Sequence, residues 1–175
     1  MLKDFNLLAS TARGNERPMV NEILFLLKDQ LCDQEASAVK TGIRGLIVAK
    51  TSLDPHDAIE KLHVLLNEHP YEFRFALRII PIERVVPTEL EAIKQAALEL
   101  AKRIGETETY RITVEKRFTS LHSTDIISAV ASEITCKADM TNPDKILLIE
   151  ILGAVTGISL VKPSEIISVL KEKML

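Results

Sequence analysis

The sequence predicts an α/β (α+β) protein built from two small units, an N-terminal βαββαβ unit packed on a C-terminal α/β unit. Its 175 residues suffice for one ordinary domain or two small ones. Hydrophobic residues make up 46% and charged residues 27%, which is typical of a folded globular chain. Strand-like and helix-like patterns also alternate along the chain. We expect one unit over residues 1–86 and the other over 87–175, without a flexible linker between them.

The first half shows the residue patterns of four strands and two helices. The predicted strands are residues 5–11, 36–40, 46–51 and 71–82. The first helix follows Asn15 and has Pro18 in its first turn, and the second begins with the Asp54–Pro55 pair. The resulting order of strand, helix, strand, strand, helix, strand is the ferredoxin-like pattern. We expect the long last strand, around Arg78, to be shared by both units.

The second half is predicted to contain three strands and three helices. Thr88 and Glu91 form an S/T-x-x-E capping box at the start of a helix that stops at Gly105. Another helix begins near Ser123, and a closing helix covers residues 164–174. The predicted strands are residues 110–117, 145–152 and 157–162.

The charge balance limits the partners that the chain can bind. Lys and Arg number 22 against 25 Asp and Glu, so the net charge is −3 and any anion site must be local. Aromatic residues are only 4% of the chain, and Trp is absent. The sequence therefore offers no aromatic-rich platform on which nucleobases could stack.

No motif for catalysis, metal binding or cofactor binding is evident in the sequence. The Gly42-x-x-Gly45 pair has the spacing of a KH-domain loop, but its flanks are strand-like, which favours a hairpin turn. Neither Cys32 nor Cys136 has the neighbours of a zinc ligand, a disulfide partner or a nucleophile. We expect both to be buried free thiols. The sequence thus predicts a non-enzymatic protein without metal or cofactor.

Neither a signal peptide nor a membrane segment is evident in the sequence, which predicts a cytoplasmic protein. The N-terminal apolar run is too short for a signal peptide, and the longest later run contains Glu150.

One local feature is suited to binding phosphate. A predicted strand ends in Lys116 and Arg117, and the next helix begins after His122 with Ser123. Backbone N–H groups at a helix N-terminus, together with nearby cations, bind phosphate. Ordinary capping with solvated charges fits the same residues, so both interpretations stay open.

Arginines on the last strand of the first half form a second candidate. In strand geometry, Arg74 and Arg78 share one face, opposite to the apolar side chains. They could contact a phosphate backbone or pair with nearby carboxylates. Lys137 and Lys145 lie at element ends and indicate little by themselves.

Several motifs together resemble those of the THUMP family. They are R-I-I-P-I-E, then Y-R-I-T-V-E-K-R-F-T-S-L-H-S-T-D-I-I, then N-P-D-K-I-L-L-I-E-I-L. The first half is similar to the ferredoxin-like region that precedes THUMP in the tRNA-binding adaptor of the tRNA cytidine N4-acetyltransferase. The resemblance covers nearly the whole chain.

This resemblance implies a tRNA-binding adaptor that presents tRNA to a separate enzyme, an acetyltransferase or another tRNA-modifying enzyme. It implies that the basic residues contact phosphates and that Asn142 shapes a turn, and it leaves open whether Arg74 and Arg84 touch RNA or brace the two units. The full predicted RNA-binding set is Arg74, Arg78, Arg84, Lys116, Arg117, His122, Ser123, Lys137, Asn142 and Lys145. The alternative is an interaction module that pairs through an exposed sheet edge, as in a homodimer, without binding RNA.

Overall fold

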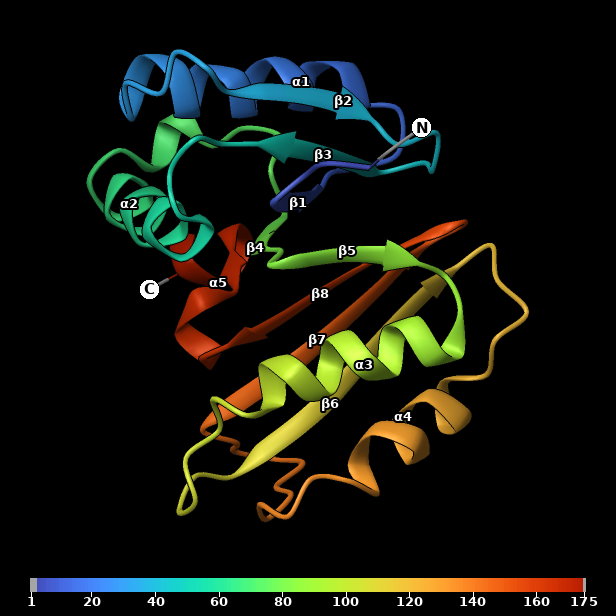
Figure 1. Cartoon of the computed structure of the whole chain (residues 1–175). Helices are drawn as coiled ribbons and strands as arrows, with labels where there is room; N and C mark the ends of the chain where they lie inside the picture. Colours follow the sequence, from blue (N-terminus) through green and yellow to red (C-terminus); the bar gives the residue numbers. More distant parts are fainter. Residues whose placement is uncertain (1–2, 175) are drawn as a thin grey trace. The chain divides into compact units, whose positions relative to one another are not determined.

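The computed structural model describes residues 3–174, which form two compact units, each with its own sheet (Figure 1). Unit 1 contains the chain up to Ile82 together with the segment from Glu165 onwards, and unit 2 is Glu83–Ser164. The division lies close to the expected boundary at residue 86. It differs in that the closing segment belongs to unit 1 and not to unit 2.

The sheet of unit 1 has the ferredoxin-like order. Its strands are β1 (Leu7–Ser10), β2 (Ser37–Lys40), β3 (Leu46–Lys50), β4 (Arg78–Pro81) and β9 (Ile167–Ser168), arranged as β2-β3-β1-β4-β9. All neighbouring strands are antiparallel. Helix α1 (Glu16–Leu24), prolonged by a π-helical segment (Phe25–Gln30), connects β1 to β2, and α2 (Pro55–Glu68) connects β3 to β4. The predicted βαββαβ unit is therefore confirmed.

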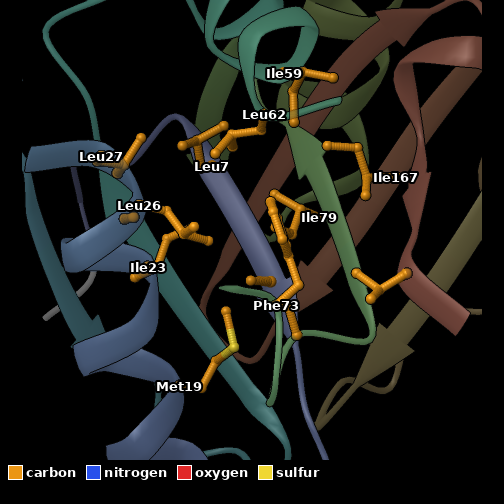
Figure 2. Close-up of a cluster of buried hydrophobic side chains, with 14 of the residues drawn as sticks. Leu7, Met19, Ile23, Leu26, Leu27, Ile59, Leu62, Phe73, Ile79 and Ile167 are labelled. Carbon is orange, nitrogen blue, oxygen red and sulfur yellow. The ribbon is translucent and has the colours of Figure 1, made fainter. Parts of the chain in front are cut away.

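The core of unit 1 lies between its two helices and one face of its sheet. Alternate strand residues such as Leu7 and Ile79 meet Ile23 of α1 and Leu62 of α2, and all four are fully buried (Figure 2). Each such side chain contributes about 1.5–3 kcal/mol through burial. The carboxylate of Asp54 accepts the N–H groups of residues 56 and 57 at 2.9 and 3.2 Å, as its predicted capping role requires.

The predicted strand over residues 71–82 is wrong in its first half, where a buried carboxylate replaces the strand partner. Residues Pro70–Glu72 form a 3-10 turn, and only Arg78–Pro81 is a strand. Glu22 of α1 accepts the N–H groups of Arg74 at 2.6 Å, Phe75 at 3.0 Å and Ala76 at 2.8 Å. Consecutive N–H groups that point to one carboxylate cannot alternate between neighbouring strands.

The predictions of a shared strand around Arg78 and of a long closing helix are also wrong. Strand β4 ends at Pro81, and the next strand belongs to the other sheet. The closing segment forms a 3-10 turn, then β9, and only then a short helix α5 (Val169–Lys173). Ile167 pairs with Ile79 and lies beside it in the core (Figure 2). The closing segment thus adds a strand to the unit 1 sheet and an apolar side chain to its core.

Unit 2 is a four-stranded sheet with both of its helices on one face (Figure 1). Its strands are β5 (Arg84–Pro87), β6 (Tyr110–Arg117), β7 (Lys145–Leu152) and β8 (Val155–Val161), in the order β5-β8-β7-β6. The parallel strands β6 and β7 are connected through α4 (Ser123–Ala131), and β5 leads into α3 (Leu90–Ala101). Leu147, Ile149 and Ile151 of β7 pack against both helices.

The predicted capping box at the start of α3 does not form. The N-cap is Glu89, without a side-chain capping bond, and the Thr88 hydroxyl lies 2.9 Å from that of Thr156. The helix also ends at Ala101, before Gly105. The N–H of Gly105 instead donates to Glu108 at 2.7 Å.

Candidate nucleic-acid interface

The carboxyl end of β6 and the start of α4 meet at one end of the unit 2 sheet. Because β6 and β7 are parallel and in register, Arg117 lies opposite Leu152, and the N–H of Gly153 donates to the Arg117 carbonyl at 2.9 Å. The N–H of Thr88, ahead of α3, donates to the Ala154 carbonyl at 2.9 Å. Both helices of unit 2 therefore begin at this end (Figure 1). We call residues 116–123 the β6–α4 corner.

Lys116 supplies the exposed cation of the β6–α4 corner. Its ammonium donates to the Leu121 carbonyl at 3.3 Å, which directs the side chain toward the start of α4. An ammonium has three donors, so it can contact a phosphate oxygen while keeping this bond.

Arg117 is tied to a buried carboxylate. Its guanidinium lies 2.8 Å from Glu150, whose side chain is 1% exposed while that of Arg117 is 24% exposed. A buried carboxylate needs such a partner, because an unpaired buried charge is strongly destabilising. Arg117 thus has a structural role that the sequence pattern did not indicate, and its proposed phosphate contact would use its remaining donors.

The N-terminus of α4 lacks a side-chain cap. The N-cap is His122, with an exposed side chain and extended backbone, and Ser123 is the first helical residue. The N–H groups of Asp125 and Ile126 donate to the His122 carbonyl at 3.1 and 3.2 Å. The N-cap side chain does not bond to the N–H groups of Ser123 and Thr124, so these two remain available to an anion. The exposed Asp125 in the first turn also lies in the favourable field of the helix end.

Three other predicted residues lie at the opposite end of unit 2. Lys145 begins β7 and pairs with Tyr110 at the start of β6, and Lys137 and Asn142 lie in the connection that precedes it. Each strand has eight residues, so the two ends of the sheet are separated by roughly 25 Å at about 3.3 Å per residue. The structure therefore does not bring the predicted set together at one site.

At this opposite end, polar groups are engaged in local turns. The ammonium of Lys145 lies 3.2 Å from Glu108, and the N–H of Gly105 and this lysine together hold the pKa of Glu108 below its ordinary value. The carboxylate of Asp139 accepts the N–H groups of residues 141 and 142 at 2.9 and 3.0 Å. These bonds lower the pKa of Asp139. Asn142 thus lies in a turn, with its side chain exposed, as Lys137 is.

The three remaining predicted arginines have separate environments. Arg74 is exposed and lies in the segment that Glu22 holds, so it does not share a strand face with Arg78, which is half-buried in β4. Arg84 lies in β5 of unit 2, and its guanidinium is 3.5 Å from Glu99 of α3. Arg84 therefore connects a strand and a helix of one unit.

Phe118, which follows Arg117 directly, is not among the binding residues predicted from the sequence. Its side chain is 80% exposed, and its φ of +56° lies in the left-handed region. An aromatic residue after a K-R strand end is visible in the sequence, but its exposure and backbone conformation are not.

Across residues 3–174, no group of three or more His, Cys, Asp or Glu side chains is placed to hold a metal ion. Cys136 is half-buried, but Cys32 is exposed, so the expectation of two buried thiols is wrong for Cys32. Within the same range, every helix is too short or too polar to cross a bilayer.

Comparison with known proteins relates the second half of the chain to one domain family. Residues 87–161 match the THUMP domain. Among curated proteins, none matches the chain.

Solved structures with a similar fold cover both units. PH1313 from Pyrococcus horikoshii Ot3 gives a TM-score of 0.64 at 22% identity, over 94% of this chain and 55% of that one. TrmN from Thermus thermophilus gives 0.60 at 13%, over 92% and 47%. A 4-thiouridine synthetase in complex with RNA and ATP gives 0.52 at 13%, over 91% and 42%. The chain thus shares its fold with these proteins and spans about half of their length.

Proposed function

We propose that this chain is a non-catalytic tRNA-binding adaptor that presents tRNA to a separate modification enzyme. The partner that the sequence resemblance favours is a cytidine acetyltransferase, and the reaction is the partner's. The observation that carries the RNA-binding part is the β6–α4 corner, where exposed Lys116 and the uncapped N-terminus of α4 adjoin. This corner lies inside the residues that match the THUMP domain.

Two further observations support RNA as the ligand. The positive end of α4 and the Lys116 ammonium together are suited to a phosphate group, which occurs once in every nucleotide. One of the structurally similar proteins, the 4-thiouridine synthetase, was solved in complex with RNA. The likeness lies in the fold, so the contacts in this chain are proposed from its own residues.

The acidic balance of the chain sets the expected strength of binding. At a net charge of −3, only a local patch can neutralise phosphates, and we expect about 4 to 6 phosphate contacts. Such binding is modest and falls steeply with salt. An adaptor can work at modest affinity, because a partner enzyme that holds the same tRNA adds its own contacts.

Changing Lys116 to Ala tests the corner directly. We expect weaker tRNA binding and a salt dependence of log Kd that is shallower by about one, because one phosphate contact is lost. The measurement is fluorescence anisotropy with labelled tRNA at four or more salt concentrations. The matched control is Lys102→Ala, which removes an exposed lysine beyond the carboxyl end of α3. Equal slopes for wild type and Lys116→Ala would exclude this corner as the interface.

The adaptor role requires a separate test. Purification of the chain from its native cells, followed by mass spectrometry, should identify a tRNA-modifying enzyme that remains bound. Adding the chain to that enzyme should raise the rate of tRNA modification at limiting tRNA concentration. A partner that modifies tRNA equally well without the chain contradicts the adaptor role and leaves RNA binding untouched.

A second candidate function is self-association through the edge of the unit 1 sheet. Strand β2 pairs with β3 alone among the described strands, and its Val39 is 52% exposed. An edge strand with an exposed apolar side chain can pair with a second copy. Sedimentation with and without tRNA separates the two candidates, because this module should dimerise and ignore tRNA.

A further inference from the structure

Phe118 has two features that a purely structural residue would not need. Its ring is 80% exposed, so it contributes almost nothing to the core of unit 2. Its backbone adopts a φ of +56°, a conformation that is unfavourable for a residue with a bulky side chain. Strained residues of this kind cluster at sites of ligand binding, where the surrounding structure holds them in place.

The surrounding chain fixes Phe118 from both sides. On one side, the carbonyl of Arg117 accepts the N–H of Gly153 at 2.9 Å. On the other, the N–H of Leu121 donates to the Thr119 hydroxyl at 3.2 Å. The backbone around Phe118 is therefore held in the β6–α4 corner, which reduces the backbone entropy that a ligand must remove on binding.

The groups around Phe118 indicate which ligand fits it. Lys116 and the start of α4 suit a phosphate, and a flat aromatic ring beside them suits a planar base. The other aromatic residue of unit 2, Tyr110, is 4% exposed and cannot serve. Bases inside a duplex are already stacked on both faces, so the ring can stack on an unpaired base but not on a base within a duplex.

We propose that Phe118 stacks on an unpaired nucleobase, so that the β6–α4 corner prefers RNA with unpaired nucleotides over fully paired RNA. This inference rests on the proposed RNA binding and adds the class of RNA that the corner selects. It assigns the phosphate contact to Lys116 and the base contact to Phe118.

The test compares two RNAs and two aromatic variants. Phe118→Ala should weaken binding of a tRNA transcript by about 5- to 150-fold, the range expected for loss of one base–aromatic stack. Binding of a long RNA duplex, whose end pairs are a small share of its binding sites, should change by less than about 2-fold. Phe118→Trp should restore tRNA affinity. Because the chain has no Trp, the fluorescence of this variant should be quenched by tRNA and not by the duplex.

A matched control lies at the opposite end of the same unit. Met140 is 69% exposed, so Met140→Ala also removes an exposed apolar side chain, and it should leave both affinities unchanged. Thermal melting checks that Phe118→Ala is folded. Phe118→Gly is a second variant for the same loss of affinity, since Gly tolerates the positive φ.

The outcomes separate this inference from the proposed function. If Phe118→Ala binds tRNA as well as wild type, or weakens tRNA and duplex equally, base stacking is refuted. In that case a loss of tRNA affinity in Lys116→Ala would still support the proposed RNA-binding function. If the wild-type chain binds no tRNA at low salt, the proposed function fails, and the inference fails with it.

Discussion

At the residue scale, Gly45 shows how one missing side chain fixes the connection between β2 and β3. Its φ is +80°, and a Cβ atom there would lie 2.9 Å from the carbonyl oxygen of Thr11. Its N–H also donates to Glu16 at 2.5 Å. Gly42, in the same loop, has a φ of +84°, but a Cβ atom there would meet nothing within 4 Å. Both glycines adopt a positive φ that favours Gly, and only at Gly45 would a side chain also clash with a neighbouring atom.

This difference predicts unequal costs for two alanine substitutions. Gly42→Ala should lower the free energy of unfolding by about 1 kcal/mol, the cost of a left-handed non-Gly residue. Gly45→Ala should cost about 2–4 kcal/mol, because a contact with rigid backbone is added to the same strain. Urea denaturation of both variants measures the difference. Equal losses would mean that the loop can move away from Thr11.

At the element scale, Asp33 connects the end of the π-helical segment to the turn after β3. The side chain is buried and accepts hydrogen bonds from Thr51 Oγ1 at 2.5 Å and from the N–H and hydroxyl of Ser52 at 2.9 and 2.5 Å. Burial alone raises the pKa of this carboxyl, but the hydrogen bonds outweigh burial and hold its pKa below the ordinary value. The ionised form is therefore favoured by folding.

The lowered pKa gives the direction of the acid response. Ionised Asp33 stabilises the folded chain above its unfolded pKa of about 3.9, and this contribution is lost as pH falls through the lower folded pKa. Asp33→Asn should be less stable than wild type by about 1–3 kcal/mol at pH 7, and the difference should shrink below about pH 4. Urea midpoints at pH 7, 5 and 3 measure it. The exposed Asp29→Asn is the control; a constant Asp33→Asn difference across this range would contradict the assignment.

The elements differ in how far a local pattern can predict them. The bounds of β6 and β7 were predictable from sequence alone, because β6 alternates apolar and polar residues and β7 is a nearly continuous apolar run. The segment before β4 could not be predicted, because its N–H groups are bound by Glu22, more than fifty positions earlier in the chain. The capping box failed for a similar reason, since Thr88 finds Thr156 across the sheet. Local patterns fail where a distant polar group supplies the partner.

At the scale of the whole molecule, chain topology decides which candidate residues can act together. Lys116 and Ser123 are close in sequence, so a strand end followed by a helix start already places them together. Lys145 is separated from them because α4 carries the chain back to the starting end of β6 before β7 begins. The exposure of Phe118 had no sequence signal, because an apolar residue directly after a strand can be either buried or exposed. The phosphate-binding part of the site was thus predictable, and the proposed base contact was not.

The return of the closing segment to unit 1 gives a prediction that the sequence-based division at residue 86 does not make. Ile167 is fully buried in the unit 1 core and pairs with Ile79. Ile167→Ala should lower the stability of unit 1 by about 2–5 kcal/mol, because it leaves a cavity between strand and helix side chains. The control is Leu170→Ala, at a position that is 62% exposed.

Hydrogen exchange followed by mass spectrometry locates the effect of Ile167→Ala. Amides of β1, β3 and β4 should lose protection, because they share the core that Ile167 completes, while amides of β6 and β7 should keep it. Each unit has its own buried cluster, so loss of one core residue acts first on its own sheet. Loss of protection that begins in β6 and β7 would instead assign the closing segment to unit 2.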